Sequence, residues 1–284
     1  MGWTSSRYEF RMVFLFLLMH AGVLAVFFVP FSPRLLLWTA ATYAIRMFAV
    51  TAGYHRYFSH RSYKLGRGAQ FCMAALAQSS GQKGVLWWAA HHRWHHRHSD
   101  AEPDVHSPGL RGFWWAHVGW ILSNEFDGYD ERQIADFAKF PELRWLDSYH
   151  WVPAAIFALL VLLIGGFGAF VWGFLLSTVL LYHATFCINS LAHVFGSRRF
   201  QTRIRAATTG FWRCSPSAKA GITTITFRWP VAGRDFAGGR WILLMPCWWE
   251  VDITYAVLKV LSYLGIACDL RPFRVPSQRV RRAA

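Results

Sequence analysis

The chain has 284 residues, of which 54% are hydrophobic and 18% aromatic, and its formal net charge is +15. This composition excludes a disordered protein and leaves either one large soluble domain or a small membrane protein. The charge alone would suit nucleic-acid binding, but no basic helix, aromatic stacking motif or nucleic-acid-binding signature accompanies it, so we expect no nucleic-acid partner. The five cysteines show no paired spacing and predict neither a disulfide framework nor a zinc site.

Four nearly unbroken apolar runs favour the membrane class, because each can extend to the ~20 residues that a helix needs to cross a bilayer. Buried core helices of a soluble protein are the alternative. The first run does not resemble a cleavable signal peptide, because its apolar core is long and no small-residue cleavage site follows it. Short connections predict two helical hairpins, formed by Met12–Val29 with Leu35–Val50 and by Val152–Ile164 with Phe167–Leu181.

The distribution of basic residues predicts the orientation. The segment from His55 to His150 contains eleven Lys or Arg residues, whereas the connection within the first hairpin has only Arg34 and that within the second has none. Basic residues remain on the cytoplasmic side of a membrane. The long loop and both termini are therefore expected to be cytoplasmic, at the inner membrane if the protein is bacterial.

Two histidine groups follow the second apolar run. His55 and His60 lie where that helix is expected to leave the membrane, and five more histidines lie between residues 91 and 98. On a helix, the offsets 0, 3 and 4 of His92, His95 and His96 place three imidazoles on one face.

A further candidate lies at the cytoplasmic end of the fourth apolar helix. His193 ends the sequence N-S-L-A-H, and Asn189 lies one helical turn before it. Imidazole suits zinc, copper, iron and nickel, and groups from separate segments suggest that two metals share the site. Non-haem iron fits best, because the setting is membranous and thiolate ligands are absent, and its use would be oxygen activation beside an apolar substrate.

Acidic residues directly after the second group could orient its imidazoles by accepting hydrogen bonds from the other ring nitrogen. They are Asp100, Glu102 and Asp104.

Isolated polar residues near the apolar runs have simpler explanations. His20 and His183 are expected to be packed, hydrogen-bonded side chains, and His117 and His150 to be interfacial anchors. Arg46 lies within the second helix, where a charge is costly, so it should face the protein interior or a polar cavity.

Together these segments resemble the membrane fatty acyl desaturase family, the acyl-CoA delta-9 type above all. The first histidine group is similar to that family's box H-R-x-x-S-H and the second to H-R-x-H-H. The resemblance covers roughly residues 10–202 and 248–272, and joint motifs of this kind are specific. The segments that carry it are Thr51–Arg61, Trp88–His96, Gly112–Trp120, Asn189–Gly196 and Trp248–Thr254.

The resemblance implies an all-α integral membrane protein with four transmembrane helices in two hairpins and a cytoplasmic helical cap. A long acyl chain, as acyl-CoA or acyl lipid, would lie in an apolar tunnel beneath two non-haem irons. Dioxygen and two electrons from a small redox protein, similar to cytochrome b5, ferredoxin or rubredoxin, would remove two vicinal hydrogens and leave a cis double bond. The tunnel would fix which carbon faces the metals, which is catalysis by positioning.

The same resemblance implies the metal ligands by motif. His91 is left out, because relatives often have an acidic residue there. The iron ligands would be His55, His60, His92, His95, His96 and His193, with Asn189 reaching iron through water.

One family feature is missing. The third box, G-E-G-W-H-N-N-H-H, should supply three more ligands between Gly196 and Trp248, but the chain has no histidine there. Residues 203–246 also look foreign, because seven Lys or Arg against one Asp give 7 − 1 = +6 of the net charge without an amphipathic period or a transmembrane run. We treat residues 1–284 as a single domain in which 203–246 is off-frame, and we expect disorder in that segment.

A frameshift explains the loss. When each third codon base from Ser217 to Thr226 is read with the first two bases of the next codon, permitted codon choices give G-E-G-W-H-N-N-H-H. A shift near Thr202 that is corrected near Cys247 would remove the box and then restore W-W-E-V-D-I-T. The chain keeps six of nine expected histidines, so we expect impaired activity.

Three other functions stay open at this point. One is a related histidine-box hydroxylase or lipid-linked desaturase, which product analysis would separate. Another is a bis-histidine haem electron carrier, which a Soret band would reveal. The third is an inactive membrane remnant that folds without metal.

Overall fold

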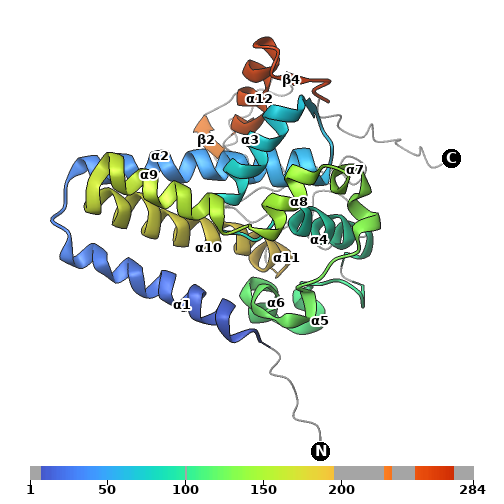
Figure 1. Ribbon diagram of the computed structural model, residues 1–284, viewed down its shortest axis with the longest axis horizontal. Helices are drawn as coiled ribbons and strands as arrows, with labels where there is room; N and C mark the ends of the chain where they lie inside the picture. The colour runs from blue at the N-terminus through green and yellow to red at the C-terminus, as the bar shows by residue number, and fades with distance from the viewer. Residues whose placement is uncertain (1–7, 100, 195–226, 232–246, 272–284) are drawn as a thin grey trace, which may run out of the picture.

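The computed structural model describes residues 8–99, 101–194, 227–231 and 247–271. Four long apolar stretches run side by side in one half of the molecule, and shorter helices gather at one end of them (Figure 1). The long stretches are α1 (Phe10–Val23) with η1 (Leu24–Phe28), α2 (Pro33–Ala49) with η2 (Val50–Ser59), α9 (Val152–Ala169), and η6 (Phe170–Leu176) with α10 (Ser177–Asn189).

Among the described residues, three continuous helices are long and apolar enough to cross a membrane, namely Phe10–Phe28, Pro33–Ser59 and Val152–Asn189. The third contains a break at Gly166, whose φ of 74° is a left-handed conformation that glycine adopts without steric cost. The break falls between the two apolar runs that the sequence predicts for this region. Apolar helices of membrane length are thus confirmed.

The shorter helices form the other half of the fold, and Figure 1 shows α4 to α8 close together beyond the ends of α2 and α10. They are α3 (Arg67–Gln78), α4 (Val85–His98), α5 (Pro108–Arg111), η3 (Trp115–Gly119), α6 (Trp120–Leu122), η4 (Asn124–Phe126), η5 (Glu131–Ile134), α7 (Ala135–Ala138), α8 (Pro141–Ser148), α11 (Leu191–Val194) and α12 (Ile253–Tyr263).

A few short strands accompany the predicted helices. β1 (Lys64–Leu65) pairs antiparallel with β4 (Ala267–Cys268), and β2 (Phe227–Val231) pairs antiparallel with β3 (Cys247–Val251). The molecule is therefore mostly helical with two small two-stranded sheets. Apart from β2, the segment 203–246 lies outside the described residues, so the prediction of disorder there remains a prediction.

The main hydrophobic core lies where η2 packs against α3 and α4, which also pack against α8. Tyr54, Phe58, Leu86 and Leu143 are at most 1% exposed there. Helix α1 contrasts with this region, because it has no buried residue and Phe10 is 82% exposed. A helix that is apolar all round and exposed in isolation is the pattern of a membrane span.

Arg46 is fully buried within α2, as expected for a charge on a membrane helix. Its guanidinium donates hydrogen bonds to the hydroxyls of Ser177 and Thr178 on α10 and to the carbonyl of Thr42. Its Cζ lies 4.9 Å from the centre of the Phe157 ring. The prediction that Arg46 faces the protein interior is confirmed.

Candidate metal centre

The first histidine pair lies in a π-helical segment, η2. In a regular α-helix, residues five apart point about 140° away from each other, because each residue turns the chain by about 100°. The π-helix closes its backbone hydrogen bonds five residues apart, and His60 N donates to His55 O over 3.1 Å. The two rings therefore lie on one face, with centroids 4.5 Å apart. The local helix type explains the spacing of this motif.

Helix α4 brings the second group to the first. His92 Nε2 lies 3.1 Å from His60 Nε2 and 3.0 Å from His96 Nε2. Ligand atoms of His55, His60, His92 and His96 all lie within 4.8 Å of one another, and we call these four residues the first cluster. Two imidazole nitrogens bound at right angles to one ion, at about 2.1 Å each, would lie about 3 Å apart. The ring spacing suits a single cation.

His95 points away from the first cluster to a second one, formed by His95, Asp104 and His106. His95 Nδ1 lies 2.8 Å from Asp104 Oδ1, and the rings of His95 and His106 have centroids 4.1 Å apart. The ring of His193 lies 5.5 Å from that of His95. The three imidazoles predicted on one face of α4 thus divide between two clusters.

His106 is the member of this cluster that the sequence analysis missed. It lies outside the two histidine groups, in a stretch without regular structure, so helical spacing could not indicate it. The sequence Asp104-Val105-His106 offered a weaker signal, since two potential ligands stand two residues apart shortly after a histidine group. Of the three acidic residues predicted to orient imidazoles, Asp104 contacts His95, Glu102 is exposed, and Asp100 lies outside the described residues.

Two buried ring nitrogens, one in each cluster, favour metal binding at these sites. His55 Nε2 and His106 Nδ1 are buried and have no hydrogen-bond partner among the residues that the structure describes. A buried polar atom without a partner is costly, and native structures usually satisfy it. A metal ion bound in each cluster would supply the missing partner for its own nitrogen.

Burial also favours the neutral form of the imidazoles, which is the form that binds metal. Desolvation, followed by the nearby His96 and Arg93, lowers the pKa of His60 to about 3. Desolvation, followed by His95 and His193, lowers the pKa of His96 to about 4. Both rings are therefore neutral at physiological pH and present a lone pair to a cation.

Stacked aromatic rings hold the first cluster from the side. The indole of Trp88 stacks on His92 with ring centroids 4.7 Å apart, and Tyr54 stacks on Trp88 with centroids 5.2 Å apart. The Tyr54 hydroxyl donates to the carbonyl of Lys83 over 2.8 Å, which fixes this stack to the loop before α4. The orientation of His92 thus depends on packing as well as on hydrogen bonds.

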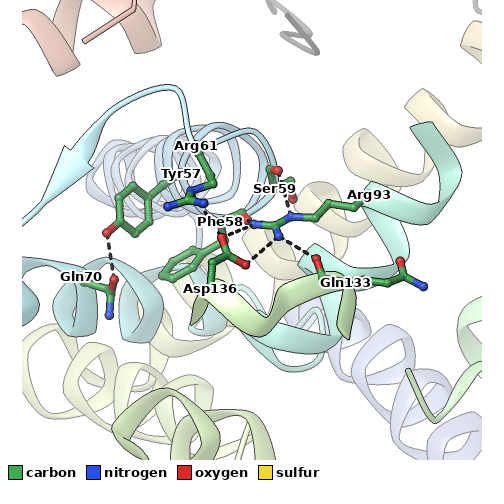
Figure 2. Close-up of polar contacts among 8 residues, drawn as sticks. All are labelled: Tyr57, Phe58, Ser59, Arg61, Gln70, Arg93, Gln133 and Asp136. Carbon is green, nitrogen blue, oxygen red and sulfur yellow. Dashed lines mark hydrogen bonds and ion pairs between the residues drawn. The ribbon is translucent and has the colours of Figure 1, made fainter. Parts of the chain in front are cut away.

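A guanidinium joins the two histidine segments from the other side. Arg93, directly after His92, donates from Nε to the carbonyl of Ser59 over 3.1 Å and from Nη2 to the carbonyl of Phe58. Figure 2 shows the same guanidinium pointing to the Asp136 carboxylate, whose oxygens lie 2.8 and 3.0 Å from it. Arg93 therefore connects α4, η2 and α7.

Next to the clusters lies a largely apolar cavity of about 420 Å³. One face of η6 and α10 lines the cavity up to the candidate ligand Asn189. His92 and His106 line it as well. Helix α1 also lines the cavity, through Met12, Leu15, Phe16, Leu18 and Met19. On η6 and α10 the lining residues are Phe174, Thr178, Tyr182, Thr185, Phe186 and Asn189.

Three other histidines form a separate hydrogen-bonded chain. His183 on α10 lies 3.0 Å from His20 of α1 through Nε2 and 3.0 Å from His117 of η3 through Nδ1. His117 Nδ1 lies 2.9 Å from the hydroxyl of Ser190. These contacts confirm that His20 and His183 are packed, hydrogen-bonded residues. They show that His117 is bonded too, while the interfacial role of His117 and His150 remains a prediction.

Comparisons with known proteins agree with these features. The model of the fatty acid desaturase family matches residues 32–217. The sn-1 stearoyl-lipid 9-desaturase of Anabaena variabilis is 30% identical over 263 residues, which cover 90% of this chain and 91% of that protein. The acyl-CoA C20 Delta5-desaturase of Anemone leveillei is 29% identical, covering 89% and 79%. A probable acyl-CoA desaturase of Schizosaccharomyces pombe is 30% identical, covering 89% and 52%.

Proposed function

Because the chain belongs to the fatty acid desaturase family and is an oxidoreductase of fatty acyl chains by that membership, we propose that it acts at a histidine-ligated di-iron centre with dioxygen as co-substrate. The observation that carries the proposal is the pair of histidine clusters beside an apolar cavity. The substrate would be a long acyl chain, either as acyl-CoA or as acyl lipid, and the double bond would be cis at the delta-9 position. Relatives named for both substrate forms support this breadth.

The residues present fit two irons. The first cluster offers four imidazoles, and the second offers His95 and His106, with His193 nearby. His55, His60, His92, His95, His96 and His193 would be ligands by motif, the position of His106 favours adding it, and Asn189 would reach iron through water. The two buried ring nitrogens without partners support the assignment. Iron bound here would supply the oxygen-dependent redox chemistry that removes hydrogen from an unactivated methylene.

The protein's own part is to position the chain and exclude water. The reaction takes two hydrogens from neighbouring carbons and consumes one dioxygen, two electrons and two protons, giving one alkene and two waters. Electrons would come from a small redox protein of the cytochrome b5, ferredoxin or rubredoxin kind. The apolar lining along α10 would hold the acyl chain in one position relative to the clusters. That position would determine which two carbons lose hydrogen.

The arrangement in the membrane follows from the same helices. We propose four spans in two hairpins, with the break at Gly166 forming the second hairpin. The histidine clusters, the eleven basic residues of the long loop and both termini would lie on the cytoplasmic side.

The absent third box favours a second candidate, an inactive membrane remnant. Two irons would lack three expected histidine ligands, so the printed chain should have little or no activity. The segment that would contain the box lies mostly outside the described residues. The proposed cause, a frameshift between Thr202 and Cys247, can be tested on the gene.

The deciding experiment sequences the coding DNA across codons 195–255 and expresses two chains, the printed one and one with the frame restored. We expect the restored chain to bind two irons and to convert a saturated acyl substrate to a cis-unsaturated product. The printed chain should bind less iron and give no product, measured by metal analysis and by mass spectrometry of fatty acids. Two tightly bound irons and turnover in the printed chain would contradict its impairment. A hydroxylated product would instead favour a related hydroxylase.

A further inference from the structure

All three guanidinium nitrogens of Arg93 donate hydrogen bonds where α4 meets η2. Beside the carbonyls of Phe58 and Ser59, it donates from Nη1 to the carbonyl of Gln133 over 2.7 Å (Figure 2). Its side chain is only 15% exposed. Phe58 and Ser59 lie between His55 and His60, so Arg93 fixes the backbone that presents both rings to the cluster. A planar guanidinium with several fixed donors suits such a role, whereas an ammonium does not.

Asp136 forms ion pairs with two arginines, Arg93 and Arg61. Its carboxylate accepts from Arg93 and also lies 3.4 Å from Nε of Arg61, the residue directly after His60. Both guanidinium carbons lie over the ring of Phe137, at 5.7 and 5.9 Å from its centroid. Asp136 is 18% exposed and Arg93 is 15% exposed, so water screens this pair of charges incompletely.

The arrangement has an electrostatic consequence for any cation at the first cluster. Arg93 directly follows His92, and its guanidinium is bonded to the backbone just before His60, so its positive charge lies beside the first cluster. Arg61 directly follows His60, meets the same carboxylate and is 63% exposed, so its charge is better screened by water. A metal ion at the cluster would be repelled by both charges, and Asp136 offsets part of that repulsion. Neutralising Asp136 would leave Arg93 uncompensated in a partly dehydrated region, where like charges interact more strongly than in water.

We propose that Arg93 and Asp136 are positioning residues of the first cluster, with Arg93 fixing the backbone between His55 and His60 and Asp136 offsetting the positive charge that Arg93 and Arg61 place beside a bound cation. The inference rests on the proposed metal centre. Asp136 on α7 would thus change the affinity for the metal through its charge, without contacting the metal.

The test uses Co²⁺ binding to the purified chain in detergent, followed by its absorption spectrum, with the melting temperature of the metal-free protein measured in parallel. We expect Asp136→Asn to weaken Co²⁺ binding by roughly 10–100-fold, the range known for outer residues of metal sites. Arg93→Lys should weaken it as well, because lysine keeps the charge but cannot serve all four acceptors. The control is Glu142→Gln, which breaks the exposed ion pair with Arg67 and should leave Co²⁺ affinity unchanged.

The double variant Arg61→Gln/Asp136→Asn separates charge from structure. If Asp136 acts by charge, removing one of the two uncompensated cations should recover part of the lost affinity, even where the melting temperature does not recover. Unchanged affinity in Asp136→Asn, or a double variant no better than the single one, would overturn the proposal. If the unmodified chain does not bind Co²⁺ at all, the first cluster is not a metal site in this chain, and this inference fails with it.

Discussion

Asp104 shows how much one buried side chain can control at the second cluster. It is 3% exposed, and its Oδ1 lies 2.8 Å from His95 Nδ1, so it fixes which ring nitrogen of His95 is left for a metal. We expect Asp104→Asn to reduce metal affinity at this cluster by roughly 10–100-fold, because the amide keeps an oxygen acceptor but loses the charge that supports the imidazole. Metal stoichiometry after dialysis against a weak chelator measures the effect.

Glu102→Gln is the matched control, because Glu102 is an exposed acid two residues earlier. Its metal content should equal that of the unmodified chain. Equal retention in both variants would show that Asp104 has no part in metal binding.

At the scale of residues, the sequence identified most of the imidazoles and named Asp104 among three possible partners, but it did not show which imidazole meets which partner. Spacing on a helix located His92, His95 and His96, yet it could not show that His95 turns to Asp104 while its neighbours turn to His55 and His60. That division depends on where α4 lies against η2 and the following loop, which is tertiary information. The same holds for the partners of Arg93, which come from three segments.

At the scale of elements, the close approach of α4 and α8 leaves no room for a side chain at Gly84. Gly84 precedes α4, and a Cβ added there would lie 2.0 Å from Asp147 Oδ1. That carboxylate accepts the backbone N–H groups of Leu86 and Trp87 over 2.8 and 3.0 Å and thereby caps the helix with the second histidine group. We expect Gly84→Ala to destabilise the fold by about 1–3 kcal/mol, as overpacking of a tight contact does, measured by thermal unfolding in detergent.

Gly68→Ala provides the comparison, because a Cβ added at this position in α3 meets nothing within 4 Å. It should be neutral or slightly stabilising, by up to about 1 kcal/mol, since alanine favours a helix over glycine. Equal melting temperatures for the two variants would contradict the close approach at Gly84.

Hydropathy predicted the long apolar elements well, including the division of the second pair near Gly166. It could not predict the π-helical form of η2, because π-helices arise from local packing and hydrogen bonding rather than from an apolar period. The two small sheets were also missed, because strands of two residues, as in β1 and β4, or of five, as in β2 and β3, are too short to carry a clear period. The segment that brings His55 and His60 onto one face was thus not predictable from hydropathy.

At the scale of the whole molecule, sidedness can be tested with the chain's own thiols. Cys72 on α3 and Cys268 on β4 are exposed, and the pairing of β1 with β4 places their segments close together. We expect single-cysteine chains that keep either thiol to react with a membrane-impermeant maleimide only from the cytoplasmic side, because the basic loop belongs there.

Phe31→Cys in a cysteine-free background supplies the opposite control. Phe31 is 64% exposed in the connection between η1 and α2, at the far end of the first hairpin. It should react only from the other side of the membrane. Labelling of Cys72 and Phe31→Cys from the same side would refute the hairpin arrangement.

The cavity has one further consequence, which arises from α1. This helix forms one wall through five side chains, yet none of its residues is buried, and its His20 meets His183 across the interface with α10. On that side α1 would stand between a bound acyl chain and the surrounding lipid. A change in bilayer thickness that tilts α1 would then change the shape of the cavity, so we expect the proposed position of the chain to depend on the thickness of the membrane.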